Sequence, residues 1–358
     1  MFLRHLKKFN WRIVFFAVSL SLLGMISIYS SQGDSSNFLK QAVFLTTGLM
    51  LMTVVSFFDW RVFKENSYII LFLYFLFIIS LIGLFFFAPE IKGAKRWYKI
   101  GDLSFDPLEV GKIILIILFA KYFSMRHAEM YKLRHIFFSG IYVLIPSIFV
   151  FFRPDMGSAV ILIFLWLGVL LFSGIKLRYF ITIILIGLII FGIGWSFFLK
   201  DYQKSRIINF ISPQEDPLGA GWSQIQSKIA IGSGGIFGQG VLMGSQTQYG
   251  FLSEPHTDFI FAAIAEEMGF LGSFALFFIF LLLIRELFKI VFYSKSNFSR
   301  LFSAGLAVLL MAQFFVNIGM NLGILPVVGI PLPFVSYGGS SLISLFLSLG
   351  IIQSIKTH

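Results

Sequence analysis

The chain has 358 residues, of which 58% are hydrophobic, 18% aromatic and only 13% charged. Soluble globular proteins are about 45 to 50% apolar and about 25% charged, so this composition excludes a soluble enzyme and indicates an integral membrane protein. The net charge of +11 would suggest a nucleic-acid partner in a soluble protein, but here we attribute it to loops that set membrane orientation and contact lipid head groups.

Apolar segments long enough to cross a bilayer recur along the whole chain. A helix needs about 20 mainly apolar residues to cross a hydrocarbon core about 30 Å thick. The basic N-terminus leads into an apolar run without a signal-peptide cleavage site, so we expect a retained first span. The sequence predicts an all-α polytopic bundle that forms a single domain over residues 1–358, with both termini in the cytoplasm. The ten predicted spans are residues 12–30, 38–57, 67–88, 108–124, 136–152, 157–173, 179–199, 258–284, 301–320 and 338–355.

Two predicted exterior loops are unusually basic. Most Lys and Arg residues lie on loops that this topology places in the cytoplasm, as the positive-inside rule requires. The exceptions gather in residues 92–112 and in the polar segment 200–257 between spans seven and eight. That segment is far longer than an ordinary connection of about 4 to 6 residues, which indicates a functional loop. We expect it to form short helices at the outer membrane surface.

Charges near the spans are candidates for function, because a charge at the bilayer centre costs at least about 2.5 kcal/mol. Glu109 and Lys112 lie three residues apart at the start of the fourth span. They predict either a local ion pair or a lysine directed at a phosphate. Arg153 and Asp155 flank Pro154 between spans five and six, where the simpler interpretation is a turn with an interfacial ion pair.

A glycine-rich string occupies residues 232–240. It resembles a nucleotide-binding loop, but Phe237 takes the place of the last glycine of G-x-G-x-x-G, and the chain has no Walker lysine motif. We therefore expect tight turns with positive φ angles, with a minority of the glycines available to let the backbone approach a ligand.

Asp258 opens the eighth predicted span, where the exterior loop becomes a helix. One interpretation is an N-cap, because an aspartate there accepts hydrogen bonds from free N–H groups and suits the helix dipole. The other is a general base that is half shielded from water at the membrane surface. A positioned base contributes about 10² to 10⁴ in rate.

Metal ligands are sparse in this sequence. The chain has no cysteine, which excludes disulfides, thiol catalysis and cysteine-bound zinc. His256 is the only histidine that the topology places outside, and it alternates with Glu254 and Asp258. This spacing is a weak signal for zinc. A loosely held Mg²⁺ or Mn²⁺, bound jointly with a substrate pyrophosphate, stays open.

Polar residues also continue into the last spans. Glu266 and Glu267 lie about 12 Å below Asp258 along a helix and are candidates for the floor of a polar cavity. A stripe of amides, Gln313, Asn317 and Asn321, recurs every four residues on span nine and is more typical of interhelical contacts than of a pore. Three prolines between residues 326 and 333, followed by a Gly- and Ser-rich run, predict irregular backbone. At membrane depth such backbone must be buried or line a cavity.

Five motifs in this order resemble the SEDS family (shape, elongation, division and sporulation), and more closely its elongation branch than its division branch. They cover most of the chain, and two are slightly changed: Met156 stands where relatives usually have leucine, and Ser253 to Pro255 replaces a usual Pro-Glu. The motifs are residues 93–112, 153–159, 216–240, 256–272 and 317–341.

The resemblance implies a peptidoglycan glycosyltransferase on the outer face of the bacterial cytoplasmic membrane. In this hypothesis Asp258 deprotonates the sugar hydroxyl of one lipid II, which attacks the donor anomeric carbon with inversion and releases undecaprenyl pyrophosphate. Asp258, Arg96, Glu109 and Lys112 match the family's motif positions. The candidate substrate-binding residues are Arg96, Glu109, Lys112, Arg153, Asp155, Arg206, Gln226, His256, Thr257 and Ser336.

The same resemblance implies protein partners, namely a class B penicillin-binding protein that crosslinks the strands and the rest of the elongation machinery. Two rival interpretations stay open at this point. A lipid II flippase or other transporter would use Glu266, Glu267 and the amide stripe as a translocation path. A membrane scaffold would only dock other cell-wall enzymes. Polar groups gathered at one face favour surface chemistry over passage.

Overall fold

The computed structural model describes residues 5, 7–32, 35–90, 95–101, 103–126, 133–153, 155–197, 204, 205, 208, 210–212 and 221–357. Each of the ten predicted spans coincides with one long helix in these residues. Eight of these helices are long and apolar enough to cross a membrane, whereas α8 is shorter and α6 carries Glu109, Lys112 and Lys121. The long helices are α2 (Trp11–Gln32), α3 (Ser35–Phe57), α5 (Ser67–Phe87), α6 (Pro107–Met125), α7 (Leu133–Phe152), α8 (Met156–Phe172), α9 (Leu177–Phe197), α13 (Ile260–Tyr293), α14 (Asn297–Asn321) and α15 (Gly339–Thr357).

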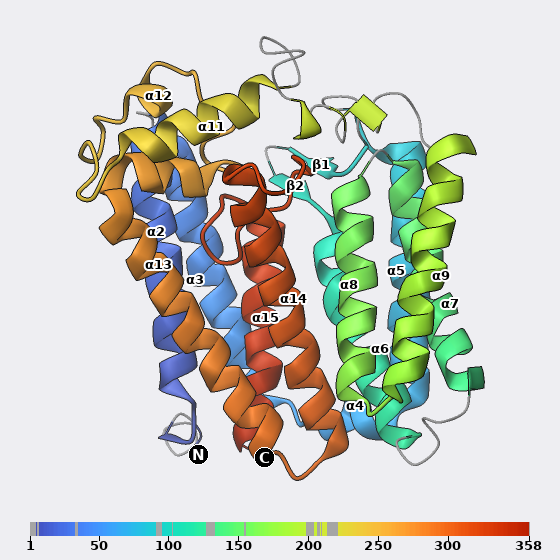
Figure 1. Ribbon diagram of the computed structural model, residues 1–358. Helices are drawn as coiled ribbons and strands as arrows, with labels where there is room; N and C mark the ends of the chain where they lie inside the picture. Colours follow the sequence, from blue (N-terminus) through green and yellow to red (C-terminus); the bar gives the residue numbers. More distant parts are fainter. Residues whose placement is uncertain are drawn as a thin grey trace.

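The two ends of the bundle differ in what they carry. Both chain termini lie at one end, together with the short helix α4 (Arg61–Glu65). The opposite end carries the strands β1 (Tyr98–Ile100) and β2 (Leu103–Phe105) and the helices α11 (Trp222–Ser233) and α12 (Ser245–Gln248) (Figure 1). The predicted short helices of segment 200–257 are therefore present in its described part. Below, this opposite end is called the loop end.

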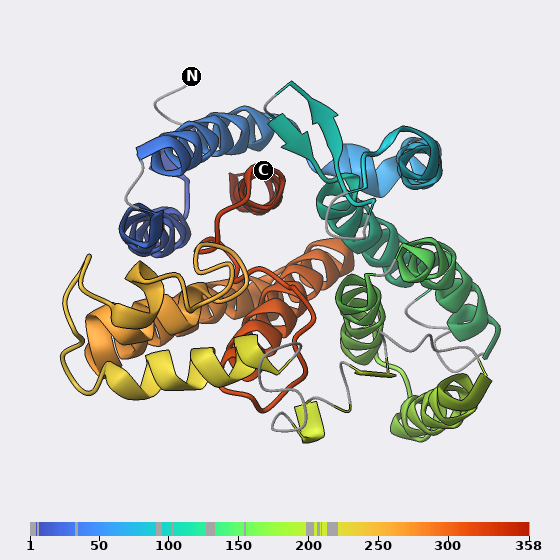
Figure 2. The same cartoon turned by 90° about the horizontal axis from the view of Figure 1, so that it is seen from above.

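Helices α14 and α15 join the two halves of the bundle. Helix α14 packs against α13 on one side and against α6 and α8 on the other, and α15 packs against α3 and α6. Seen from the loop end, α14 and α15 lie between the group α2, α3 and α13 and the group α5 to α9 (Figure 2). Large aromatic side chains of α14 are buried against its neighbours, among them Phe298, Phe302 and Phe314. Residues at the loop end of both halves are thereby brought to one central region.

The all-α bundle that the sequence predicts is confirmed, and a short hairpin of β1 and β2 is added to its loop end. The strands are antiparallel, with Tyr98 opposite Phe105 and Ile100 opposite Leu103. Gly101 begins the turn with φ +63°, a conformation that glycine adopts without strain. The dipeptide Gly-Asp at residues 101–102, between two short runs of β-prone residues, is a hairpin signal. A prediction of membrane spans alone does not use it. The hairpin leads directly into α6 and places Arg96 just before its first strand.

Helix α13 is interrupted at Gly269, where φ is +64° and ψ is −160°. The break frees main-chain groups that the glycine-rich loop then satisfies. Gln239 N and Gly240 N donate to the carbonyls of Glu266 and Glu267 at 2.9 and 3.0 Å. In return the N–H groups of residues 270 and 271 donate to the carbonyls of residues 235 and 236. Such pairing lets a broken helix exist at membrane depth.

These contacts also settle the role of the glycine-rich string. Gly235, Gly238 and Gly240 have positive φ angles, as the turn interpretation predicted.

The eighth span was expected to be continuous and to end at residue 284, but α13 is broken and continues to Tyr293. Its last turns extend well beyond the length that a hydrocarbon core requires.

Replacing Gly269 with alanine is expected to lower the thermal stability of the protein. A Cβ there would meet Gly238 N and lie 2.6 Å from Ile236 O, and alanine is strained at a φ of +64°. We expect a cost of more than about 2 kcal/mol, seen as a lower Tm in detergent. Gly187→Ala is the control, because this α9 glycine is helical with nothing within 4 Å of its Cβ position. Equal Tm values for the two variants would contradict this account of the break.

Residues 322–338, between α14 and α15, form no helix and cross the loop end of the bundle. We call this segment the strap. Ile330, Leu332, Phe334 and Val335 are each at most 2% exposed, so this part of the strap lies inside the protein, whereas residues 322–325 lie nearer the surface. This agrees with the expectation that the proline-rich segment is irregular backbone buried at membrane depth.

Candidate active site

Asp258 lies in a turn just before α13, and it is not the N-cap of that helix. The N-cap is Phe259, and no side chain caps it. The turn is closed by the Glu254 carbonyl, which accepts from Thr257 N and Phe259 N, both at 3.2 Å. The N-cap interpretation of Asp258 is therefore wrong, because the turn ends one residue later than the sequence pattern indicated. Its carboxylate is not needed to terminate the helix.

The strap and α14 hold this turn from outside. Tyr337 N donates to the His256 carbonyl at 2.9 Å, and Ser336 Oγ donates to the Thr257 carbonyl at 2.7 Å. Ser336 Oγ in turn accepts from Leu332 N at 2.8 Å. Ser336, Thr257 and His256, three predicted site residues, are thus brought together by backbone contacts. The side chain of Ser336 thus supports the turn that carries Asp258.

The amides of α14 complete the support. Asn317 Nδ2 and Asn321 Nδ2 both donate to the Asp258 carbonyl at 3.0 Å. Asn321 Oδ1 also accepts from Ala262 N in the first turn of α13, at 3.1 Å. The interpretation of the amide stripe as interhelical contacts is confirmed for Asn321, which joins α14 to α13, whereas Asn317 contacts the turn and the strap. The third member, Gln313, is buried, and its Oε1 has no hydrogen-bond partner.

Gly329 of the strap faces both Asp258 and Arg96. A Cβ built on Gly329 would lie 3.4 Å from Asp258 Oδ2 and 3.8 Å from Arg96 Nη1. The acid and the guanidinium, far apart in sequence, therefore converge on one turn of the strap. Gly329 has φ +67°, and its missing side chain leaves the space between the two groups open.

Arg96 is fixed by an ion pair with Asp155. Arg96 Nη2 lies 2.8 Å from Asp155 Oδ1, and the Asp155 side chain is only 4% exposed. Asp155 caps α8 by accepting from Ser158 N at 3.2 Å. Arg153 is buried nearby, where it interacts electrostatically with Arg96 and Asp155 and donates from Nη1 to the Lys95 carbonyl at 3.3 Å. The Nε atoms of both arginines are buried without a hydrogen-bond partner. Two guanidinium groups with unused donors thus lie close together, and one of them, that of Arg96, is beside Gly329 of the strap.

Glu109 and Lys112 pair with each other across one turn of α6. Lys112 Nζ lies 2.7 Å from Glu109 Oε1, and both side chains are largely buried. Of the two alternatives drawn from the sequence, the structure has the local ion pair. A contact of Lys112 with a phosphate stays a prediction.

Asp106 is a residue near the site that sequence reasoning missed. Its side chain accepts from Leu108 N at 2.9 Å and caps α6, while its backbone N–H donates to Ser340 Oγ at 3.0 Å. The pKa of the Asp106 carboxyl is raised to about 7, first by burial and then by the carboxylate of Glu109, while the Leu108 N–H opposes the shift. Asp directly before Pro at the first helical position is an N-cap signature that could have identified it.

Replacing Asp106 with asparagine is expected to stabilise the protein above neutral pH but not in acid. The pKa rises from 3.8 in the unfolded chain to about 7 in the folded protein. The folded state therefore keeps a proton that the unfolded state releases, so the wild type loses stability as pH rises through this range. Asparagine keeps the cap without titrating. Thermal unfolding between about pH 4.5 and about pH 8.5 should show a Tm gain that grows up to pH 7 and then levels off. A gain that is independent of pH would contradict this account.

Glu266 and Glu267 do not form the floor of a cavity. Both are buried, and their side chains bind the loop that carries α12. Glu266 accepts from Gln246 N at 2.6 Å and from Thr247 N and Oγ1 at 3.1 and 2.7 Å. Glu267 accepts from Ser30 Oγ. The cavity expectation is wrong because these carboxylates accept hydrogen bonds from free N–H groups of the loop. The spacing of the two residues along the helix gives no sign of these donors.

The remaining predicted residues are placed less centrally. His256 Nε2 lies 3.9 Å from Glu254 Oε2, and the ring packs edge-on against Tyr337. Gln226 is buried on α11, next to Ser227, which donates to the Asn321 carbonyl at 2.8 Å. Arg206 lies outside the described residues. Within the described part of the chain, no three His, Asp or Glu side chains converge as metal ligands.

Known proteins resemble this chain in sequence over most of its length. The model of a family described as "Cell cycle protein", named for FtsW, RodA and SpoVE, matches residues 9–358. The peptidoglycan glycosyltransferase MrdB of Escherichia coli (strain K12) is 38% identical over 343 residues, which cover 95% of this chain and 91% of that protein. The peptidoglycan glycosyltransferase RodA of Treponema pallidum (strain Nichols) is 32% identical over 437 aligned residues and covers 100% of both chains.

A solved structure extends the likeness to three dimensions. Its description reads "Structural coordination of polymerization and crosslinking by a peptidoglycan synthase complex". One chain of it superimposes with a TM-score of 0.83 at 28% identity, covering 97% of each chain. The fold is therefore shared over nearly the whole of both chains.

Proposed function

Because this chain belongs to the FtsW, RodA and SpoVE family of cell cycle proteins, we propose that it is a peptidoglycan glycosyltransferase that polymerises lipid II during cell elongation. Its relatives from Escherichia coli and Treponema pallidum bear the name of that activity. The observation that carries the proposal is the convergence of Asp258 Oδ2 and Arg96 Nη1 on Gly329. An acid and a cation that both lie within 4 Å of the Gly329 Cβ position suit a reaction that removes a proton and releases an anion.

In the proposed reaction Asp258 is the general base. Its carboxylate takes the proton from the 4-hydroxyl of the GlcNAc unit of one lipid II. The freed oxygen attacks the anomeric carbon of the donor MurNAc unit, and the bond from that carbon to the pyrophosphate oxygen breaks. The α-linked pyrophosphate becomes a β-1,4 glycosidic bond, the proton stays on Asp258 until water removes it, and undecaprenyl pyrophosphate leaves with the electron pair.

The arginines are the groups proposed to stabilise the leaving group. Negative charge grows on the pyrophosphate as the bond breaks, and fixed donors aimed at that charge are worth about 10² to 10³ in rate. Arg96 and Arg153 fit this role because each has a buried Nε donor without a partner. Asp155 keeps Arg96 in place and reduces the cost of holding it in the site.

A divalent cation at this site is a separate proposal. Carboxylate and phosphate oxygens are the ligands that Mg²⁺ prefers, and such an ion usually binds through one or two carboxylates together with a substrate phosphate. Asp258 offers one such carboxylate. Mg²⁺ or Mn²⁺ bound jointly with the pyrophosphate would neutralise charge there, and this stays a proposal to be tested by chelation.

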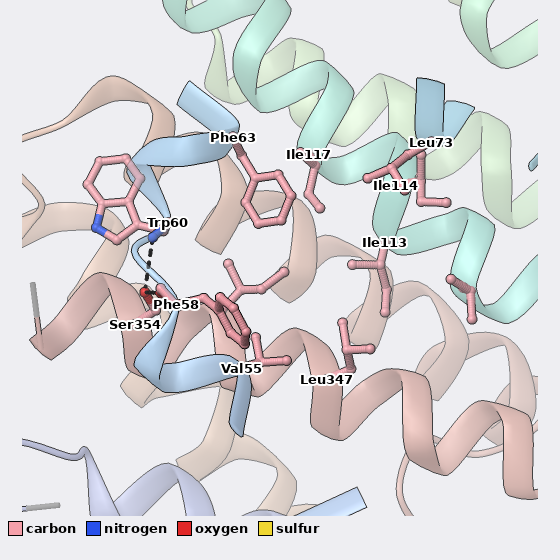
Figure 3. A pocket seen from close by; sticks show the side chains of 12 residues that line it. Val55, Phe58, Trp60, Phe63, Leu73, Ile113, Ile114, Ile117, Leu347 and Ser354 are labelled. Carbon is pink, nitrogen blue, oxygen red and sulfur yellow. Dashed lines mark hydrogen bonds between the residues drawn. The ribbon is translucent and has the colours of Figure 1, made fainter. Parts of the chain in front are cut away.

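An apolar groove is the proposed place for a polyprenyl tail. It has a volume of about 380 Å³ and lies between α3, α4, α5, α6 and α15 (Figure 3). Ile113, Ile114 and Ile117 of α6 line one wall, and Leu347 of α15 lies across from them. Val110 and Ile351 also line the groove. The groove starts at the residue after Glu109, so a lipid whose head group reaches the charged residues at the start of α6 can continue into it. Apolar walls of this kind suit an isoprenoid chain.

The orientation of the protein follows from the reaction. Lipid II is used on the outer face of the bacterial cytoplasmic membrane, so we place the loop end outside and both termini in the cytoplasm. The basic residues at the loop end then face an anionic lipid substrate, which explains their departure from the positive-inside rule. A class B penicillin-binding protein is the proposed partner, since a related chain comes from a complex described as coupling polymerization to crosslinking.

The transporter alternative has less support. It depended on Glu266, Glu267 and the amide stripe as a translocation path. Glu266 binds the α12 loop, and Glu267 accepts from Ser30 of α2 and from Gln248 of α12. Asn317 and Asn321 bind main-chain groups of the turn and strap. Polar groups engaged in this way do not line a path near the membrane centre, where a transporter collects its site.

The proposal is tested with the full-length chain in nanodiscs and labelled lipid II, alone and with a class B penicillin-binding protein. The expected product is a ladder of glycan strands together with undecaprenyl pyrophosphate in equal amount to the bonds formed. A parallel assay measures transfer of lipid II across vesicles that contain the chain. Transfer without glycan synthesis would support the transporter and reject the enzyme, whereas neither activity under both conditions would support the scaffold.

A further inference from the structure

Asn317 makes two contacts at once, on opposite sides of the site. One N–H of its Nδ2 group donates to the Asp258 carbonyl at 3.0 Å, and the other donates to the Ile330 carbonyl at 2.8 Å. A primary amide has two N–H donors, so both are used. The first contact is to the turn that carries the proposed base, and the second is to the strap, one residue after Gly329. Asn317 is buried on α14, which fixes the position of its side chain.

Three other residues also hold the turn. Tyr337 N and Ser336 Oγ donate to the two carbonyls before Asp258, and both belong to the end of the strap that leads into α15. Asn321 donates to the Asp258 carbonyl and accepts from Ala262 N, so it fixes the turn relative to α13. Asn317 differs from them because it joins the Asp258 carbonyl to the part of the strap beside Gly329.

The space at Gly329 makes that distance important. The gap between the Gly329 Cβ position and Asp258 Oδ2 is 3.4 Å, and that to Arg96 Nη1 is 3.8 Å. A shift of the strap by about 1 Å would change the space that Gly329 leaves beside the acid and the cation. Misplacement of that size can cost about 10² in rate.

From this geometry we propose that Asn317 is a positioning residue for catalysis, which sets the separation between the Asp258 carboxylate and the strap at Gly329 through its two donated hydrogen bonds. The proposal rests on the proposed function, since it assigns a role in the reaction of Asp258. Asn317 does not touch the substrate. It acts through the main chain of Asp258 and Ile330.

The test compares Asn317→Leu with Gln313→Leu in the full-length chain, by initial rates of lipid II polymerisation. Both remove a buried amide from the same face of α14, one turn apart, but Gln313 has an unpartnered Oε1 that leucine would remove without loss. We expect Asn317→Leu to lower kcat of the folded protein by about 30- to 100-fold with less than about threefold change in KM. Gln313→Leu should keep kcat within about twofold.

A second variant keeps the test decisive if Asn317→Leu fails to fold. Asn317→Gln retains the amide and moves it by one methylene, so a purely structural amide would still find its partners. The positioning role predicts a loss of kcat of about tenfold or more with Tm near the wild-type value. In addition, Gly329→Ala combined with Asn317→Gln should cost clearly less than the product of the two single losses, because both changes disturb one distance.

Two outcomes separate the inference from the function on which it rests. Wild-type kcat in folded Asn317→Leu and Asn317→Gln, with Asp258→Asn inactive, would overturn the positioning role and leave the proposed function intact. Wild-type kcat in Asp258→Asn would overturn the proposed function itself. Losses in Asn317 variants that appear only as a lower yield of folded protein, with normal kcat per folded molecule, also count against the positioning role.

Discussion

Replacing Asp258 with asparagine is expected to reduce lipid II polymerisation by about 10² to 10⁴, because the amide cannot accept the proton of the attacking hydroxyl. The change is nearly isosteric, and the contacts that hold residue 258 are made to its carbonyl, which the substitution keeps. The variant should therefore fold with a Tm close to that of the wild type. Glycan length and initial rate are measured by gel with labelled lipid II.

The control for this prediction is Glu254→Gln. Glu254 lies in the same turn, and its carbonyl closes that turn, so its side chain can be changed without loss of the main-chain contacts. We expect its rate to stay within about threefold of the wild type, as for an exposed surface substitution. If the Asp258→Asn variant polymerised lipid II as fast as the Glu254→Gln variant, Asp258 would not be the general base.

Replacing Arg96 with glutamine is expected to lower kcat by about 10² to 10³, because a donor aimed at the developing pyrophosphate charge is lost. Affinity for the product undecaprenyl pyrophosphate should fall by at least about tenfold, the cost of a hydrogen bond to a charged group. Arg96→Lys should recover only a small part of either loss, since lysine lacks the planar fork that pairs with Asp155 and a phosphate together.

Lys99→Gln is the matched control for Arg96. It removes one positive charge from an exposed position on β1, three residues away, and should leave kcat within about twofold at physiological salt. Product affinity is measured by competition with labelled lipid II. Equal effects of Arg96→Gln and Lys99→Gln would mean that the loop end attracts the anionic lipid by overall charge and that Arg96 has no special place.

The spans were predictable from the sequence, because membrane helices carry their signal in local composition. Each predicted span coincides with one long helix, and the largest error is at the end of α13. A helix that leaves the membrane becomes polar gradually, as at Arg285 and Lys289, and local windows cannot tell where its hydrogen bonds stop. The break at Gly269 also has no local signal, since it depends on a loop that supplies partners for the freed groups.

Individual site residues were predictable, but their relations were not. Asp258, Arg96 and Asp155 stand out because charges are rare near spans. The link between Asn317 and Ile330, the approach of Gly329 to Asp258, and the pairing of Ser336 with Thr257 join segments that only tertiary packing brings together. The N-cap error at Asp258 and the cavity error at Glu266 have the same cause: a side chain's type indicates which bonds it can form, while the fold decides which partner is within reach.

The strap has a consequence for the biosynthesis of the protein. Ribosomes add about 5 to 20 residues per second, so Asp258 is made several seconds before Ser336, whose hydroxyl binds the carbonyl next to it. Until α14 and the strap have been made, the turn that carries Asp258 lacks the hydrogen bonds that hold it. With Asp258 as the proposed base, a nascent or prematurely terminated chain would be unable to join sugars, and unfinished copies would not disturb the wall while translation continues.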